Sequence, residues 1–163
     1  GAKMTGVDIS DVAIHTATLH AEKQGLEIEY LNCEAEDLLP KEKESFDLVT
    51  CLEAIEHVPD PVKLVETCSN LCKPGGTIVF STINRNPKSF LFAIVGAEYI
   101  LNLLPKGTHE YKKFLKPSEL SSMMRNNSLE VVEVIGMSYN PITKNYWLGK
   151  DVDVNYLIHA KKK

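Results

Sequence analysis

Several features are scarce in this sequence, and each scarcity narrows the class of protein. The four cysteines include no CxxC pair and no paired-cluster spacing, which argues against a cysteine-based zinc site and favours a reducing compartment. No apolar run reaches the roughly 20 residues that a membrane-spanning helix needs, and no stretch has the form of a signal peptide. The formal net charge of -4 is small, so nothing indicates nucleic acid as a partner.

The sequence has the composition and patterning of one globular domain. It has 163 residues, 44% of them hydrophobic, without internal repeats or low-complexity linkers. The patterns predict strands at 4–9, 28–31, 46–51 and 77–83, helices at about 11–24, 61–72 and 117–126, and two closing β-rich stretches at 129–139 and 152–160. Strands that alternate with helices predict an α/β fold with an open, mostly parallel sheet and an antiparallel C-terminal edge.

Local signals mark the ends of these elements. Ser10 or Asp11 can cap the first helix, and Gly25 can terminate it. Asp60 followed by Pro61 is an N-cap with proline at the first helical position. The strand at 46–51 is apolar enough to predict burial on both faces, as in a parallel sheet.

Acidic residues follow the first two predicted strands. Asp8 ends the first strand, where a carboxylate can accept hydrogen bonds from both hydroxyls of a ribose. Its alternative role is to cap the following helix. Glu34 follows the second strand, where an acidic side chain can contact an adenine amino group; the alternative there is a solvated polar loop.

A third acidic group follows the strand at 46–51. Glu53, Glu56 and His57 are spaced i, i+3 and i+4, so one helical turn would project all three together. Two carboxylates and an imidazole suit Mg²⁺, Mn²⁺ or Zn²⁺. Two alternatives remain: His57 acts as a general base, or the carboxylates are exposed groups favoured by a helix dipole.

These motifs resemble a known family. The acidic turn with His57-Val58-Pro59-Asp60, followed by Lys73-Pro74-Gly75-Gly76, resembles the later motifs of class I S-adenosylmethionine (SAM)-dependent methyltransferases. Longer strings resemble the ubiquinone-biosynthesis O-methyltransferases, more closely the mitochondrial branch; they are Phe80–Asn86, Val95–Ile100, Leu104–His109, Tyr139–Ile142 and Val152–Tyr156. The resemblance covers essentially all 163 residues.

The resemblance implies an enzyme with a Rossmann-like fold that methylates catechol-type hydroxyls on polyprenylated rings (polyprenyl-dihydroxybenzoate and demethylubiquinol) with SAM. It implies that SAM is contacted by Asp8, Glu34 and the backbone of Leu52. It also implies a divalent metal bound by Glu53, Glu56 and His57, with Mg²⁺ as the first choice and Zn²⁺ or Mn²⁺ as alternatives. His57 is then also the catalytic residue. It further implies a peripheral protein of the mitochondrial inner membrane, on the matrix side, that joins other ubiquinone-biosynthesis proteins in a multi-subunit complex.

One departure from the family concerns the start of the chain. The family's first strand and its glycine-rich turn would precede Gly1, so we expect activity in a longer parent and not in this chain. We expect the strands at 4–9 and 46–51 either to pair directly or to mediate dimerisation. The rival function is a catalytically silent, methyltransferase-like scaffold subunit of a lipid-biosynthetic complex.

An apolar segment interrupts the domain at about 88–116. Between Phe90 and Leu104 the strongly polar residues are Glu98 and Asn102, and lysines flank the segment. This pattern predicts docking to a membrane surface, and the alternatives are a core helix or a lid over the substrate.

Overall fold

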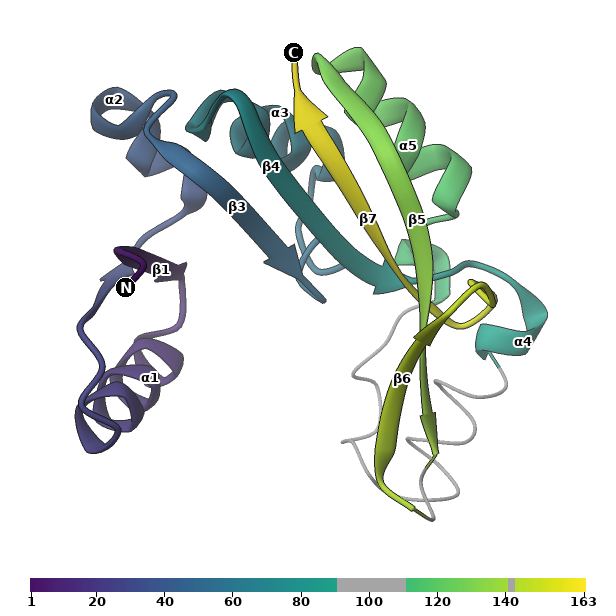
Figure 1. Cartoon of the computed structure of the whole chain (residues 1–163), viewed down its shortest axis with the longest axis horizontal. Helices are drawn as coiled ribbons and strands as arrows, with labels where there is room; N and C mark the ends of the chain where they lie inside the picture. Colours follow the sequence, from purple (N-terminus) through teal and green to yellow (C-terminus); the bar gives the residue numbers. More distant parts are fainter. Residues whose placement is uncertain (91–110, 141–142) are drawn as a thin grey trace. The chain divides into compact units, whose positions relative to one another are not determined.

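A computed structural model describes residues 1–90, 111–140 and 143–163. The chain divides into two compact units, Gly1–Lys43 and Glu44–Lys163, and each unit has its own sheet (Figure 1). No strand pairing joins the two sheets among the described residues. A single domain over residues 1–163 therefore stays a prediction.

The first unit is a strand–helix–strand motif followed by a short helical segment. β1 (Met4–Asp8) and β2 (Ile28–Asn32) pair in parallel, connected by α1 (Asp11–Lys23). Ser10 caps α1, as predicted, by accepting a hydrogen bond from the Ala13 N–H at 3.3 Å. Gly25 ends the helix with a φ of 66°, a conformation that glycine adopts without strain. The 3₁₀ helix η1 (Ala35–Leu38) and α2 (Leu39–Glu42) follow.

The second unit is built on a five-stranded mixed sheet. Its strands are β3 (Phe46–Leu52), β4 (Cys72–Ile83), β5 (Leu129–Asn140), β6 (Asn145–Gly149) and β7 (Asn155–Lys162), in the order β3-β4-β7-β5-β6. β3 and β4 are parallel, and the three remaining pairs are antiparallel. The predicted α/β class with an antiparallel C-terminal edge is confirmed. β6 was not predicted, because its five residues follow a stretch without a clear strand pattern.

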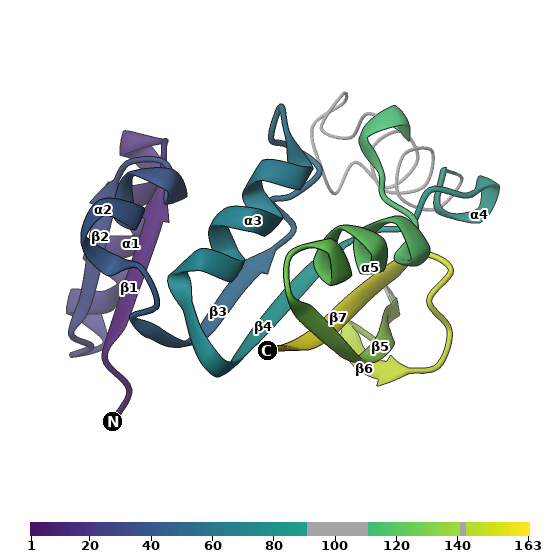
Figure 2. The same cartoon turned by 90° about the horizontal axis from the view of Figure 1, so that it is seen from above.

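Two helices form the core of the second unit with one face of this sheet. α3 (Pro61–Leu71) and α5 (Pro117–Asn126) lie over the same face (Figure 2). The buried side chains between these layers include Val65, Leu120, Met124, Phe80, Tyr156 and Ile158. Burying such a side chain contributes about 1.5–3 kcal/mol, which makes this interface the main source of stability in the unit.

The ends of α3 follow the sequence signals, but the burial of β3 does not. Asp60 caps α3 by accepting a hydrogen bond from the Lys63 N–H at 3.1 Å. In β3, however, Leu48 is 54% exposed and Leu52 is 53% exposed. The prediction that β3 is buried on both faces is therefore wrong for this chain. The reason is that β3 is the edge strand of its sheet and α3 packs over one side.

The predicted insertion at 88–116 is described only at its two ends. α4 (Pro87–Ser89) and Phe90 form the first end, and η3 (Tyr111–Lys113) forms the second. The rings of Phe90 and Tyr111 meet edge to face, with centroids 5.5 Å apart. Residues 91–104, which carry most of the predicted membrane contact, lie outside the described residues. Among the residues that are described, no helix is long and apolar enough to cross a membrane.

Candidate functional site

Asp8 lies at the carboxyl end of β1, as predicted. Its side chain is exposed, and Oδ1 accepts a hydrogen bond from the Ser10 N–H at 2.7 Å. The helix cap itself is Ser10, so Asp8 supports the turn between strand and helix rather than capping α1. A carboxylate with one oxygen engaged by the backbone and an exposed position is suited to accept hydroxyl donors from a ligand.

Glu34 occupies the corresponding place after β2. It is exposed, and its N–H donates a hydrogen bond to Asp37 Oδ2 at 3.0 Å, which fixes the start of η1. Because β1 and β2 are adjacent and parallel, their carboxyl ends meet at one edge of the sheet. Within the first unit the structure therefore brings the turns that carry Asp8 and Glu34 to the same edge.

The acidic group after β3 does not form the helical turn that its spacing predicts. Glu53 has a φ of 53°, in the left-handed region, and the following residues form a turn in which the His57 N–H donates to the Ala54 carbonyl at 3.0 Å. The next helix begins only at Pro61. The i, i+3, i+4 argument is therefore wrong, because the backbone leaves helical geometry at its first residue.

Two hydroxyl groups at the end of β4 hold the two carboxylates instead. Ser81 Oγ donates to Glu53 Oε1 at 2.6 Å and accepts from the Glu53 N–H at 3.0 Å. Thr82 Oγ1 donates to Glu56 Oε2 at 2.8 Å. Successive side chains of a strand point to opposite faces, so Ser81 and Thr82 hold Glu53 and Glu56 on different sides of β4.

Glu56 is the unusual member of the group. It is 3% exposed, and its Oε1 is buried without a hydrogen-bond partner among the described residues. Burial raises the pKa of the Glu56 carboxyl above its ordinary value, although the hydrogen bond from Thr82 acts in the opposite direction. A buried acceptor with an unused oxygen is costly, and such groups are concentrated at ligand sites.

The donor types fit a divalent cation, but the arrangement does not. Within residues 1–90, 111–140 and 143–163, no group of three or more His, Cys, Asp or Glu side chains is arranged to hold a metal ion. Glu53 and Glu56 are engaged by different hydroxyls, while His57 is exposed. A metal held by all three would need the turn to rearrange, because Ser81 and Thr82 hold the two carboxylates on different sides of β4. Among the described residues, the unused oxygen of Glu56 is the feature that favours a ligand here.

The sequence reasoning missed Ser81 and Thr82 as parts of the site. Both are buried, at 3% and 0% exposure, and both lie at the carboxyl end of the strand beside β3. The register pairs Leu52 with Ser81, which sets the Ser81 hydroxyl beside the first residue of the acidic turn. Consecutive hydroxyl residues at a buried strand end were the available signal, since such a strand otherwise carries apolar side chains.

The contribution of Thr82 can be measured directly. Thr82→Val keeps the shape of the side chain but removes the hydrogen bond to Glu56, and we expect it to destabilise the fold by about 1–3 kcal/mol at neutral pH. Thr82→Ser keeps the hydroxyl and should retain most of the stability. Urea unfolding of both variants tests this, and equal losses in the two would show that the hydrogen bond contributes little.

Comparisons with known proteins identify the family. The family profile of a methyltransferase domain matches residues 1–80. A ubiquinone biosynthesis O-methyltransferase of Saccharophagus degradans is 55% identical, over 99% of this chain and 69% of its own length. The enzyme of the same name from Marinobacter nauticus is 56% identical, over 99% of this chain and 68% of its own length.

Solved structures share the fold. A SAM-dependent methyltransferase of Thermotoga maritima superimposes with a TM-score of 0.67 at 26% identity, over 98% of this chain and 73% of that one. A SAM-dependent methyltransferase of Aquifex aeolicus superimposes with a TM-score of 0.67 at 13% identity, over 99% and 69%. The predicted Rossmann-like class I methyltransferase fold is confirmed by these matches. With the sequence identities above, they show that this chain belongs to the ubiquinone biosynthesis O-methyltransferases, a family of SAM-dependent enzymes.

Proposed function

We propose that the enzyme methylates a catechol-type hydroxyl on polyprenylated ring intermediates, namely polyprenyl-dihydroxybenzoate and demethylubiquinol. SAM-dependent O-methylation in ubiquinone biosynthesis follows from the family. The single observation that carries the choice of site is the acidic turn after β3, where buried Glu56, in the same turn as Glu53 and His57, keeps an unused oxygen. A substrate hydroxyl is a donor that matches such an oxygen.

The chain's own residues have separate tasks in this proposal. Bound SAM supplies an electrophilic methyl group on its sulfonium sulfur. Asp8 accepts the ribose hydroxyls, Glu34 accepts from the adenine amino group, and the backbone of Leu52 lines the cofactor. His57 takes the proton from the substrate hydroxyl, because an imidazole nitrogen is a common general base. Because methyl transfer is an in-line displacement, positioning of the two reactants contributes much of the acceleration.

The role of Asp8 predicts a selective loss of cofactor affinity. Asp8→Ala should weaken SAM binding about ten- to a hundredfold, since hydrogen bonds to a charged group contribute about 1.5–3 kcal/mol. Calorimetric titration of SAM measures this loss, in this chain and in a chain extended to the length of the relatives. Asp11→Ala is the matched control, because Asp11 is also exposed but lies in the first turn of α1. Unchanged SAM affinity in Asp8→Ala would rule out the ribose contact.

Assistance by a divalent metal, Mg²⁺ before Zn²⁺ or Mn²⁺, is also proposed. Glu53, Glu56 and His57 would hold the ion, which when bound lowers the pKa of a coordinated substrate hydroxyl. The oxygen and imidazole donors support this choice of metals. The proposal requires the acidic turn to rearrange around the ion, and titration of Mg²⁺ followed by the nuclear magnetic resonance shift of His57 can detect a change there.

The partners and location are proposals drawn from the substrate class. A polyprenylated substrate resides in a membrane, so we propose that the enzyme binds a lipid surface peripherally and works beside other ubiquinone-biosynthesis proteins in a multi-subunit complex, without a nucleic acid partner. The matrix side of the mitochondrial inner membrane stays a prediction of the resemblance. The relatives named above are bacterial and do not test it.

The rival is a catalytically silent scaffold subunit. The acidic turn favours an enzyme, because a scaffold has no use for a buried carboxylate with one oxygen left without a partner among the described residues. A methyl-transfer assay with a catechol substrate and SAM separates the two functions. Turnover that depends on Glu56 and His57 supports the enzyme, and SAM binding without turnover in the extended chain would support the scaffold.

A further inference from the structure

The outer ends of β5 and β6 carry an exposed aromatic surface. Residues 137–140 and Asn145–Gly149 form these ends, and together they make up the aromatic hairpin. β5 pairs with β7 up to Met137, and beyond it β6 is its one partner in the described part of the chain. In Figure 1 the two strands accordingly run on past the end of β7. The hairpin is therefore two strands wide and is not part of the core beneath α3 and α5.

Large apolar side chains lie on both faces of this hairpin. The register pairs Tyr139 with Tyr146 and Met137 with Leu148, so these four side chains share one face. The two tyrosine rings stack with centroids 4.4 Å apart. Exposed fractions are 39% for Tyr139, 67% for Tyr146, 51% for Trp147 and 59% for Leu148. Tyrosine and tryptophan combine an apolar ring with a polar group, which is the chemistry of a membrane–water interface.

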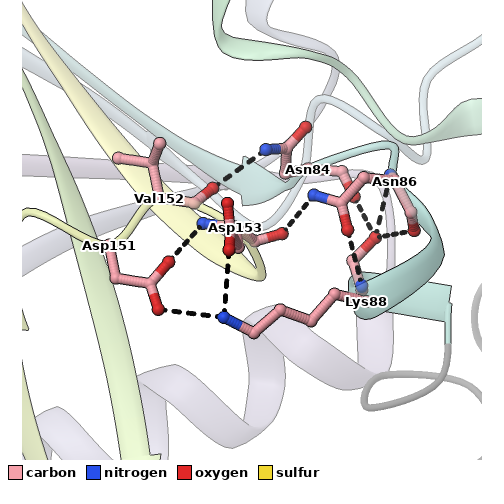
Figure 3. Close-up of polar contacts among 7 residues, drawn as sticks. Asn84, Asn86, Lys88, Asp151, Val152 and Asp153 are labelled. Carbon is pink, nitrogen blue, oxygen red and sulfur yellow. Dashed lines mark hydrogen bonds and ion pairs between the residues drawn. The ribbon is translucent and has the colours of Figure 1, made fainter.

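The charge around the hairpin is positive. Lys144 and Lys150 bracket the aromatic run, both are exposed, and residues 143–150 contain no acid. The acids that follow, Asp151 and Asp153, each accept an ion pair from Lys88 Nζ at 3.0 Å (Figure 3). Lys88 offsets one of these two negative charges, so the hairpin with Lys144 and Lys150 and this loop together keep a net charge of +1. Anionic lipid headgroups are the complementary surface.

We propose that the aromatic hairpin is a lipid-docking element that rests at the headgroup level of an anionic membrane. This inference deepens the proposed function, because it rests on the enzyme working at a lipid surface. Among the described residues β6 is an edge strand, and this limits the depth, since N–H and C=O groups along such an edge need water and cannot enter the hydrocarbon. A second copy of this chain fits less well. An antiparallel copy centred on Trp147 would set Lys144 opposite Lys150, and like charges oppose such edge pairing.

The chain contains one tryptophan, so Trp147 reports on the hairpin without a label. Addition of vesicles of phosphatidylcholine with phosphatidylglycerol should move its emission to shorter wavelength, and brominated lipids should quench it. Vesicles of phosphatidylcholine alone should have little effect. Binding with an unshifted, unquenched Trp147 would overturn the inference while leaving lipid docking intact. Failure to bind either vesicle would contradict the proposed lipid surface and the hairpin together.

Substitutions identify the residues responsible. Lys144→Ala with Lys150→Ala should weaken vesicle binding about thirtyfold, since each lysine near an anionic surface contributes about fivefold. Lys3→Ala with Lys23→Ala, the same charge change in the first unit, should leave it unchanged. Equal losses in the two pairs would overturn the inference. Vesicle binding that depends on Phe90, Phe92 and Leu101 but not on these lysines would also overturn it. A third contrary result is a dimer, detected by light scattering, in which the emission of Trp147 shifts without vesicles.

Discussion

Glu56→Gln should make the protein more resistant to unfolding at neutral pH, by about 1–3 kcal/mol. The native carboxylate is buried at 3% exposure, and Oε1 has no hydrogen-bond partner in the described part of the chain. A glutamine can still accept from Thr82, and it removes the buried charge. Urea unfolding at several pH values measures the difference between variant and parent.

The pH dependence has a definite sign. Burial raises the pKa of Glu56 in the folded state, so the parent loses stability as the pH rises through the unfolded and then the folded pKa. Glutamine does not titrate. The advantage of Glu56→Gln should therefore be largest at neutral pH and should vanish below the unfolded pKa. An advantage that does not change with pH would mean that the buried charge is not its cause.

The same substitution should abolish most of the methyl transfer. If Glu56 holds the substrate hydroxyl or a metal, its loss should lower kcat/KM at least about a hundredfold, because such contacts contribute several kcal/mol to the transition state. Glu66→Gln is the matched control, since Glu66 is an exposed carboxylate on α3. A variant that is more stable and fully active would remove Glu56 from the site.

Gly136→Ala should be among the most destabilising single substitutions in the second unit, at about 3 kcal/mol or more. A Cβ atom at Gly136 would lie 1.7 Å from the carbonyl oxygen of Asp151. That oxygen belongs to the backbone of the loop before β7. The side chains of Asn84, Asn86 and Lys88, which follow β4, donate hydrogen bonds to this loop (Figure 3). The loop cannot move without breaking those contacts, so overpacking is expected to cost more than usual.

The neighbouring strand supplies a matched control. Gly149 pairs with Gly136 across the ladder, but a Cβ there would meet only the Trp147 side chain, at 4.0 Å. Gly149→Ala should change the free energy of unfolding by no more than about 0.5 kcal/mol. Chemical denaturation of the two variants compares the same substitution at paired positions. Similar stabilities would show that the 150–154 loop is free to shift.

The sequence by itself determined the elements whose signals are local. Ser10 and Asp60 predict helix starts, because a capping side-chain oxygen accepts from a backbone N–H only three residues further along the chain. The order of strands and helices follows from hydrophobic periodicity, which is also local. The family resemblance likewise rested on contiguous strings of residues, and the identities to the relatives confirm the family.

Only the tertiary structure decided the conformation of the acidic turn. The i, i+3, i+4 spacing of Glu53, Glu56 and His57 is compatible with a helical turn, yet the Glu53 N–H binds Ser81, 28 residues further along the chain. Contact at that separation depends on the register between β3 and β4, which no local pattern encodes. The same holds for Gly136, whose need for a small side chain arises from the carbonyl of Asp151 across the fold. Local chemistry therefore selected the residues of the site, and strand register determined which of their atoms meet.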